Sequence, residues 1–433
     1  MASSVHLFLF SIAFALMLGS NALSKFKPRA YILPIKKDNV TLQYYTSIQI
    51  GEDLPYMDLV IDLGAPFLWL NCDNGYKSST YRPVRCGSSK CKVAKGFGCV
   101  GCNGALRPGC TNNTCGLYPY NPFNQSLAVG GLGEDTLVIY WTDGLLYVTT
   151  EDVPGFPFAC GHADQLFGLA NGVQGMIGLG RTQISLPAKL SSAKKIQQKF
   201  ALCITSSTES EYGAIFIGGG PYYMPPLDAS KFLTKTPLII NPVSTAVIYS
   251  EGDPSYEYFI DVKSIRIDGK VVSFNTTLLS FDKQGMGGTK LSTIIPYTVL
   301  HSAIYKALIR DFVKKAAAKK IRRVAAVAPF GACFSSKNIA STKTGPAVPT
   351  INLEVKGNNT YWRIYGANSM VRVNKHVLCL GFVDGGSEPR TSIVLGGHQL
   401  ENNLLEFDLA SSKLGFTSSL LLHNVTCSAS RIF

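Results

Sequence analysis

The chain has few charged side chains, and acidic ones are the scarcer kind. Charged residues make up 16% of its 433 residues, whereas hydrophobic residues make up 46%. Such a composition can bury a large core, which excludes intrinsic disorder. The 28 Asp and Glu residues are outnumbered by 41 Lys and Arg residues, which leaves a formal net charge of +13. This surplus favours acidic partners: nucleic acid, anionic polysaccharide, membrane headgroups or a protein with a carboxylate-lined cleft.

Long apolar runs are also missing after the N-terminus, since no later segment approaches the roughly 20 apolar residues that span a bilayer. The first 22 residues contain no Lys, Arg, Asp or Glu, and Leu7–Leu18 is an apolar run of signal-peptide length. Ser20-Asn21-Ala22 has the small-x-small form of a cleavage site. We therefore predict a signal peptide over residues 1–22 and a secreted, extracellular mature chain; the alternative, a membrane anchor, needs a longer run.

Histidine is absent from the segment in which the cysteines crowd. An even number of cysteines in a chain with a signal sequence predicts six disulfides, and oxidation leaves no thiolates for a metal. We therefore expect neither a metal site nor a cofactor. The cysteines are Cys72, Cys86, Cys91, Cys99, Cys102, Cys110, Cys115, Cys160, Cys203, Cys333, Cys379 and Cys427. Sequons for glycosylation lie at Asn39, Asn112, Asn124, Asn275, Asn358 and Asn424, and mark surface positions.

Short apolar or alternating runs, separated by Gly, Pro, Asn and Asp clusters, predict a chain made mainly of strands. About three domains or two large β lobes fit this length equally well. One helix is predicted to begin near Ser302, with cations massed toward its end. The clearest strands are residues 43–50, 56–61, 135–141, 213–217 and 258–267.

A sequence motif that occurs twice in the chain is the most informative feature. Leu59–Leu70 has the form apolar-apolar-Asp-x-Gly, and Thr289–Leu300 follows it with serine at the Asp position and isoleucine at the Gly position. With Gly175–Pro187, Ile393–Gly397 and Leu414–Phe416, these segments resemble the pepsin-like aspartic protease family in its plant form. The resemblance implies an all-β, bilobal pepsin-like fold with a few short helices. Its lobes would be residues 23–235, rich in cysteine, and residues 236–433.

The chemistry of that family requires two carboxylates that share a proton, one as base and one as acid. Here Asp62 remains, but Leu63 replaces the neighbouring hydroxyl, and Ser292 and Ile294 replace the second Asp and Gly. The family's flap sequence is also altered, to Tyr120-Asn-Pro122. We therefore expect no enzyme and no catalytic residue, Asp62 being a structural acceptor or a vestige. Ser292 is not expected to be a nucleophile, because no histidine is placed beside it.

Among secreted plant proteins, this combination resembles the inhibitors of microbial cell-wall glycosidases. That subgroup includes the xylanase inhibitors, the xyloglucan-specific endoglucanase inhibitors, the extracellular dermal glycoproteins and the basic seven-S globulins. The closer match rests on the cysteine-dense first lobe, Ser292-Thr293, Phe330–Cys333 and Cys379–Gly386. The resemblance implies that Cys203 pairs with Cys427 and Cys333 with Cys379.

Retaining glycosidases hold two carboxyl groups about 5 Å apart in an open cleft, so a cation on a rigid loop can bind both and exclude the sugar. By position in the family, the candidate loops are residues 335–345, with Lys343, and residues 420–425, with His423. Each could equally be an ordinary solvated residue. Lysine and histidine lack the bidentate fork of arginine, and a glycan at the Asn424 sequon would obstruct the second loop.

These observations predict a proteolytically inactive inhibitor, acting in plant defence on a xyloglucan-specific endo-β-1,4-glucanase of glycoside hydrolase family 12. Alternatives are a xylanase inhibitor, a peptide-binding or storage protein like the basic seven-S globulins, a cell-wall polysaccharide binder and, least favoured, a residual aspartic endopeptidase. We expect a monomer with no nucleic-acid or membrane partner. The basic stretch Lys314–Arg323 is then a solvated face that steers an acidic enzyme toward the surface.

Overall fold

A computed structural model describes residues 30–429, apart from residues 53, 74, 144–147 and 210. The predicted signal peptide, residues 1–22, lies outside the described residues. Strands dominate the rest, and one helix, α4 (Ser302–Ala318), exceeds nine residues among those described. The predicted all-β class with a few short helices is confirmed. The other α-helices are α2 (Ser89–Val93), α3 (Leu186–Lys194), α5 (Gly366–Ser369) and α6 (Gly397–Leu400).

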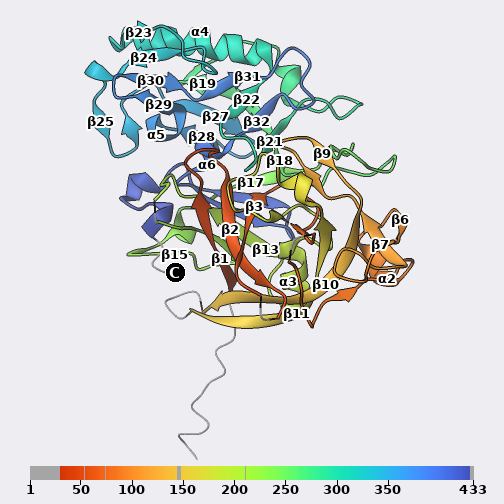
Figure 1. Ribbon diagram of the computed structural model, residues 1–433. Helices are drawn as coiled ribbons and strands as arrows, with labels where there is room; N and C mark the ends of the chain where they lie inside the picture. The colour runs from red at the N-terminus through yellow and green to blue at the C-terminus, as the bar shows by residue number, and fades with distance from the viewer. Residues whose placement is uncertain (1–29, 53, 74, 144–147, 210, 430–433) are drawn as a thin grey trace, which may run out of the picture.

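The N-terminal half forms the lower body in Figure 1. Alternating burial along β2 shows why these runs become strands, since every second side chain faces the core. Figure 1 shows the module of α2, β6 and β7 projecting from this body. Its main strands are β1 (Ala30–Lys37), β2 (Tyr44–Ile50), β3 (Met57–Asp62), β4 (Trp69–Asn71), β6 (Gly98–Val100), β7 (Thr114–Leu117), β10 (Gly130–Thr142), β11 (Val148–Gly161), β12 (Gly175–Gly178), β13 (Lys199–Cys203) and β14 (Gly213–Ile217).

Most of the C-terminal half forms the upper body, with α4 along its outer end, whereas its last, dark-blue segments lie with the lower body (Figure 1). Two four-stranded sheets, β20-β19-β27-β28 and β23-β24-β30-β29, lie in this half. Its main strands are β17 (Thr234–Ile239), β18 (Phe259–Ile260), β19 (Val262–Ile267), β20 (Lys270–Val271), β21 (Thr289–Leu291), β22 (Thr298–Leu300), β23 (Arg323–Val324), β24 (Cys333–Ser335), β27 (Ile351–Val355), β28 (Tyr361–Ile364), β29 (Met370–Asn374), β30 (Val377–Leu380), β31 (Phe382–Asp384), β32 (Ile393–Leu395), β33 (Leu404–Asp408) and β34 (Lys413–Phe416).

One antiparallel sheet connects the two halves, in the order β10-β1-β14-β13-β33-β34-β17. Phe200 of β13 pairs with Phe407 of β33, and their rings stack with centroids 4.6 Å apart. Tyr258 closes this buried aromatic cluster. Strands from both ends of the chain therefore share one core, and a lobe division at residue 235 stays a prediction.

The two copies of the sequence motif lie in strand arrangements of the same topology. In the first half, β3 runs parallel to β12, β4 runs antiparallel to β12, and β4 runs parallel to β11. In the second half, β21, β22, β32 and β31 repeat these three relations in the same order. The loops after β3 and β21 are thus equivalent positions, which explains why their sequences correspond.

All twelve cysteines form disulfides, as predicted, and none of them is free. The pairs implied by the family resemblance, Cys203–Cys427 and Cys333–Cys379, are both present. The first of these attaches the C-terminal segment to β13 across 224 residues of chain. The remaining bonds are Cys72–Cys160, Cys86–Cys99, Cys91–Cys115 and Cys102–Cys110.

Helix α4 begins at Ser302, as expected, and the His301 ring accepts a hydrogen bond from the Ala303 N–H at 3.0 Å. Its buried face includes Ile304, Leu308 and Phe312, each worth about 1.5–3 kcal/mol of hydrophobic free energy. Its other face is charged, which identifies a surface helix. Within the described ranges, no helix has both the length and the apolar character needed to cross a membrane.

Candidate functional site

The two loops that correspond to the catalytic loops of pepsin-like proteins form the same turn. The Gly64 N–H donates to Asp62 Oδ1 at 2.8 Å, and the Ile294 N–H donates to Ser292 Oγ at 3.2 Å. A hydroxyl in the second loop therefore keeps the hydrogen bond that the carboxylate makes in the first. This local role needs an acceptor two residues before the donor, and serine supplies one without supplying an acid.

Thr293 joins the two loops across the interface. Its Oγ1 donates to the Ile61 carbonyl at 2.7 Å and accepts from the Leu63 N–H at 3.0 Å. The equivalent position in the first loop is Leu63, a buried side chain with no hydroxyl to return these bonds. The connection between the loops is thus one-sided, as the replacement at Leu63 predicts.

The environment of Asp62 raises its pKa to about 6, chiefly because burial disfavours the charged form and also because the Glu257 carboxylate is near. A Cβ added at Gly64 would lie 3.1 Å from Glu257 Oε1 and 3.5 Å from Asp62 Oδ1. Lys290 Nζ, however, donates to Glu257 Oε1 at 2.7 Å. The carboxylate near Asp62 is therefore paired with an ammonium group.

The hairpin of β8 (Tyr120–Asn121) and β9 (Ser126–Leu127) corresponds to the flap. Burial and the charge of Asp62 raise the pKa of Tyr120, so this ring still lies near the cleft carboxylate. Asn121 is fully buried, and its Nδ2 donates to the carbonyls of Gln165 at 2.7 Å and Phe167 at 3.0 Å. These bonds fasten the hairpin to the chain behind it, an arrangement suited to a fixed element.

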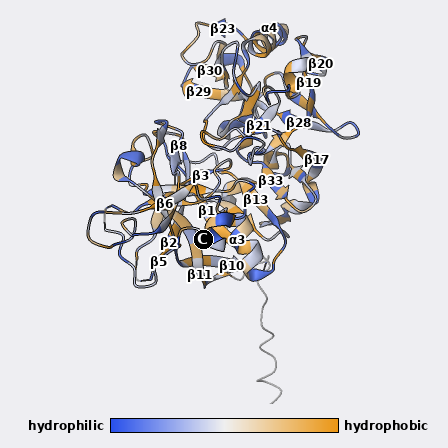
Figure 2. Cartoon of the chain, turned by 90° about the vertical axis from the view of Figure 1, so that its right-hand side faces the viewer, coloured by the Kyte–Doolittle hydropathy of each residue, from blue (hydrophilic) through white to orange (hydrophobic). Residues whose placement is uncertain are grey.

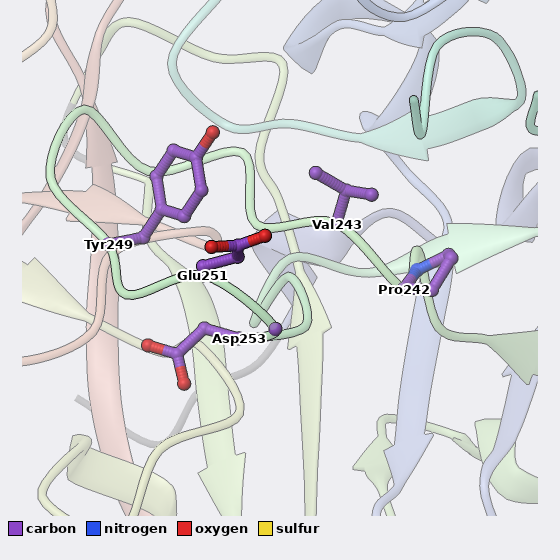
Figure 3. Close-up of a pocket in the computed structure, with 6 residues that line it drawn as sticks. Pro242, Val243, Tyr249, Glu251 and Asp253 are labelled. Carbon is purple, nitrogen blue, oxygen red and sulfur yellow. The ribbon is translucent and has the colours of Figure 1, made fainter. Parts of the chain in front are cut away.

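A cavity of ≈ 520 Å³ lies in the loop between β17 and β18, where Figure 3 shows Tyr249, Glu251 and Asp253 on one stretch of chain. Lys95, after α2, pairs with Asp253 at 2.8 Å and so connects this loop to the cysteine-rich module. Neither Asp62 nor Ser292 lines the cavity. Its lining is acidic, with the opposite sign to a surface that would bind carboxylates. The lining residues are Pro242, Val243, Tyr249, Glu251, Gly252 and Asp253.

Lys343 lies in the turn between β25 (Ser341–Thr342) and β26 (Gly345–Pro346), and its side chain is exposed. The turn is supported from below, because the Ala367 N–H donates to the Thr344 carbonyl at 2.7 Å. Gly345 has a φ of 90°, a conformation that glycine adopts without strain. Within the described residues, the Lys343 ammonium has no ion pair or hydrogen bond, so a charged ligand can reach it.

His423 ends the 3₁₀ helix η5 (Leu420–His423) and is also exposed. Its ring stacks on Phe232 with centroids 3.7 Å apart and planes 21° from parallel. This stacking fixes the ring orientation and lowers the entropy lost on binding. The next residue, Asn424, is exposed, as are the asparagines of the other five sequons. Every sequon asparagine is therefore accessible, whereas glycosylation itself stays a prediction.

The two loops contact the same short piece of chain, from Arg363 to Ala367. The Arg363 N–H donates to Ser418 Oγ, just before η5, at 3.1 Å, and the Ala367 N–H holds the Lys343 turn. Figure 1 shows β25 and α5 side by side on one flank of the upper body. The same piece of chain is thus hydrogen-bonded to the Lys343 turn and to the segment just before η5, and a shared surface for Lys343 and His423 stays a prediction.

Arg363 is a residue that the sequence reasoning missed. Its side chain is exposed on the edge strand β28, and its guanidinium lies over the Tyr361 ring, 6.0 Å from the centroid. No ion pair of this guanidinium is found in the described part of the chain. Glu354, the nearby acid on β27, instead pairs with Arg266 at 2.8 Å. The only sequence signal was an arginine two residues after a tyrosine, which alternation in a strand places on one face.

In the part of the chain that the structure describes, no three or more His, Cys, Asp or Glu side chains are grouped to hold a metal ion. The exposed side chains of the predicted site are instead the cations Lys343 and Arg363 and the imidazole of His423. The chemistry available at this surface is therefore recognition of anionic groups by hydrogen bonds and ion pairs.

Two family models match the chain: xylanase inhibitor N-terminal over residues 44–219 and xylanase inhibitor C-terminal over residues 257–418. Together they cover most of the sequence. The chain is 52% identical to the probable aspartic proteinase GIP2 of Nicotiana benthamiana, over 99% of this chain and 98% of that protein. It is 37% identical to basic 7S globulin of Glycine max, over 99% of this chain and 98% of that protein.

The structural comparison also finds basic 7S globulin, together with a second protein. The crystal structure of edgp matches with a TM-score of 0.91 and 50% identity, covering 93% of this chain and 98% of that chain. The crystal structure of basic 7S globulin from soybean matches with a TM-score of 0.81 and 36% identity, covering 94% of this chain and 98% of that chain. These matches confirm the predicted pepsin-like fold.

Proposed function

The chain belongs to the xylanase-inhibitor family, and on that premise we propose that it is a secreted inhibitor of microbial cell-wall glycosidases. Its target would be a xyloglucan-specific endo-β-1,4-glucanase of glycoside hydrolase family 12, with a xylanase as the alternative. One observation supports this proposal: Lys343, Arg363 and His423 are exposed, and the chain from Arg363 to Ala367 is hydrogen-bonded both to the Lys343 turn and to the segment just before η5. The six disulfides support an extracellular location.

The mechanism requires no reaction by this chain. A retaining glycosidase holds its two carboxyl groups about 5 Å apart, so a rigid cation between them makes charge-assisted hydrogen bonds to both. Lys343 is presented by a two-residue turn held at Ala367, and the His423 ring is held against Phe232. Presentation on elements already fixed lowers the entropy cost of insertion. The sugar is then excluded by occupancy.

Proteolysis is not part of the proposal. An aspartic peptidase needs a carboxyl pair that shares a proton, and Ser292 holds one of the two positions. Glu257 does not replace that carboxyl, because its Oε1 is paired with Lys290. We infer that the cleft around Asp62 is retained for its structural hydrogen bonds.

The experiment is a titration of the purified protein into glycosidases of families 11 and 12, with residual hydrolysis as the readout. We expect inhibition in the family 12 panel, weakened about tenfold or more by Lys343→Ala and by His423→Ala, since each loses a bond to a charged group. Lys356→Ala, at an exposed lysine outside the two loops, is the matched control.

Absence of inhibition in both panels would contradict the function and leave peptide or polysaccharide binding as the alternatives. Inhibition that neither Lys343→Ala nor His423→Ala weakens would retain the function and exclude these two residues. Digestion of denatured protein at acid pH, blocked by pepstatin, would show that the cleft is a peptidase.

A further inference from the structure

A second charged surface lies at the outer end of the C-terminal half, on α4 and the segment after it (Figure 1). Lys306, Arg310 and Lys314 are exposed at four-residue intervals, which places them about 6 Å apart along the helix axis. Lys270 of β20 joins them, since its charge acts on Asp311. We call this set the α4 basic surface; the exposed cations that follow the helix and complete it are Lys319, Lys320, Arg322 and Arg323.

Two acids beside the α4 basic surface are already paired with cations, and a third, Asp384 near Lys306, accepts hydrogen bonds from the Ser302 hydroxyl and the Gly386 N–H. Asp311 accepts from Arg310 at 2.8 Å, and Asp268 pairs with Lys319 at 3.0 Å. The hydrogen bond from Arg310 and the nearby charges of Lys270 and Lys314 hold the pKa of Asp311 below its usual range. Within the described ranges, the cations of the α4 basic surface left without an ion pair are Lys270, Lys306, Lys314, Lys320, Arg322 and Arg323.

Helix stability does not account for this pattern. Cations near the C-terminus of a helix are favoured by the helix dipole, which explains Lys315 and Lys319. Lys306 and Arg310 lie in the first half of α4, where the dipole gives no such benefit. Like charges four residues apart also destabilise a helix by about 0.2–0.5 kcal/mol per pair. The surface therefore carries a repulsion that an anionic ligand would relieve.

We propose that the α4 basic surface binds a linear polyanionic polysaccharide, a polyuronate of the extracellular matrix. The elongated row of cations fits a chain that carries one carboxylate per sugar better than a compact anion. Nucleic acid is a poorer fit, because single strands are held by stacking on aromatic rings. The large apolar side chains exposed beside these cations are Val271 and Val327, and none of the cations lies over an aromatic ring within the described ranges.

Because of its position, the α4 basic surface could bind a polyuronate independently of the proposed inhibition. Figures 1 and 2 both place α4 and β23 at the outer end of the C-terminal half, far from the strands of the N-terminal half. A polyuronate on α4 would leave the lower body exposed. The protein would thus be retained on an acidic matrix polymer while its other surfaces remain available to a protein partner.

The test measures binding of the full mature chain to decagalacturonate by calorimetry between about 50 and 200 mM salt, where ion-pair binding weakens steeply. We expect binding at low salt that falls with added salt. We also expect a loss of about tenfold or more in the variant Lys314→Gln/Lys320→Gln/Arg322→Gln/Arg323→Gln. The control Lys77→Gln/Arg85→Gln/Lys92→Gln/Lys356→Gln removes the same charge from exposed positions elsewhere and should lose less than about twofold.

Equal weakening in the two variants would overturn the proposal, because net charge alone would then explain binding. Absence of binding at low salt would overturn it as well. Tighter binding of a single-stranded DNA of equal charge would assign the surface to nucleic acid. Glycosidase inhibition by the α4 variant, measured in parallel, is expected to stay within about threefold at moderate salt, so failure of this proposal is distinct from failure of the inhibitor function.

Discussion

At the residue scale, the difference between this chain and an aspartic peptidase lies in a few side chains of an otherwise retained site. Ser292 keeps the turn hydrogen bond, Thr293 keeps the contact between the loops, and Lys290 pairs with Glu257. The site therefore keeps its hydrogen bonds with a serine at the position of the second carboxyl group. These replacements could be predicted from the sequence, because they depend only on which residues occupy the corresponding positions of the repeated motif.

Asp62 gives a pH-dependent prediction. Its folded pKa of about 6 lies above the unfolded value, so the folded state binds the proton more tightly, and stability falls as pH rises from about 4 through 6. Asp62→Asn removes this ionisation and keeps an acceptor for the Gly64 N–H. The variant should exceed the wild type in stability by up to about 3 kcal/mol at pH 7 and should match it near pH 4.

The measurement is the melting temperature of both proteins between pH 4 and 7. Asp164→Asn, at an exposed carboxyl group, is the control and should show no such divergence. A stability difference between Asp62→Asn and wild type that is constant across this range would show that Asp62 is not the titrating group.

At the scale of elements, the pairing of strands decides which loops contact each other. The sequence predicted the elements but only part of these contacts. The helix at Ser302 and the strands around Asp62 were predictable, because apolar spacing reveals them directly. Contact of the loops of Lys343 and His423 with β28 and α5 was not, since it depends on bonds from Arg363 and Ala367 to segments far away in sequence. Arg363 was missed for this reason: an exposed arginine in a strand has no local signal of function.

The placement of β28 predicts a role for Arg363 at the same surface. Arg363→Ala should weaken inhibition of a family 12 glycosidase about tenfold or more, because an exposed guanidinium on Tyr361 is positioned to bind a carboxylate. Arg363→Lys keeps the charge but not the planar guanidinium, so its inhibition constant should lie between those of the wild type and Arg363→Ala. The readout is the inhibition constant.

The control for this series is Arg372→Ala, at an exposed arginine on β29 in a different sheet. Equal inhibition constants for wild type, Arg363→Ala and Arg372→Ala would remove Arg363 from the interface while leaving the two loops in place.

At the scale of the whole molecule, the two halves are joined by a shared sheet and by a buried charge network. Lys37 of β1 pairs with Glu401 after α6 at 2.6 Å, and the Tyr44 hydroxyl donates to the same carboxylate at 2.7 Å. Burial opposes the charge of Glu401, but hydrogen bonds and charges from His398 and Lys37 outweigh this and lower its pKa. The contacts of Lys37 and Tyr44 with Glu401 were not predictable from the sequence, because more than 350 residues separate them.

The structure also shows where the surplus positive charge of the chain is concentrated. The +13 is not spread evenly, because α4 holds one concentration of cations and the loops beside β28 present another. The first surface suits an extended polyanion and the second suits a carboxylate-lined cleft. Substitutions on one surface are expected to leave binding at the other largely unchanged. Experiments can therefore test each surface separately.

In the proposed function, cations of this chain bind the catalytic carboxylates of a glycosidase. The most direct test is the dissociation constant for a family 12 enzyme compared with that for the same enzyme with both catalytic glutamates changed to glutamine. Loss of both charges should weaken binding by at least about 30-fold, because charge-assisted bonds become neutral ones in a desolvated cleft. Equal affinity for the two enzymes would contradict the account.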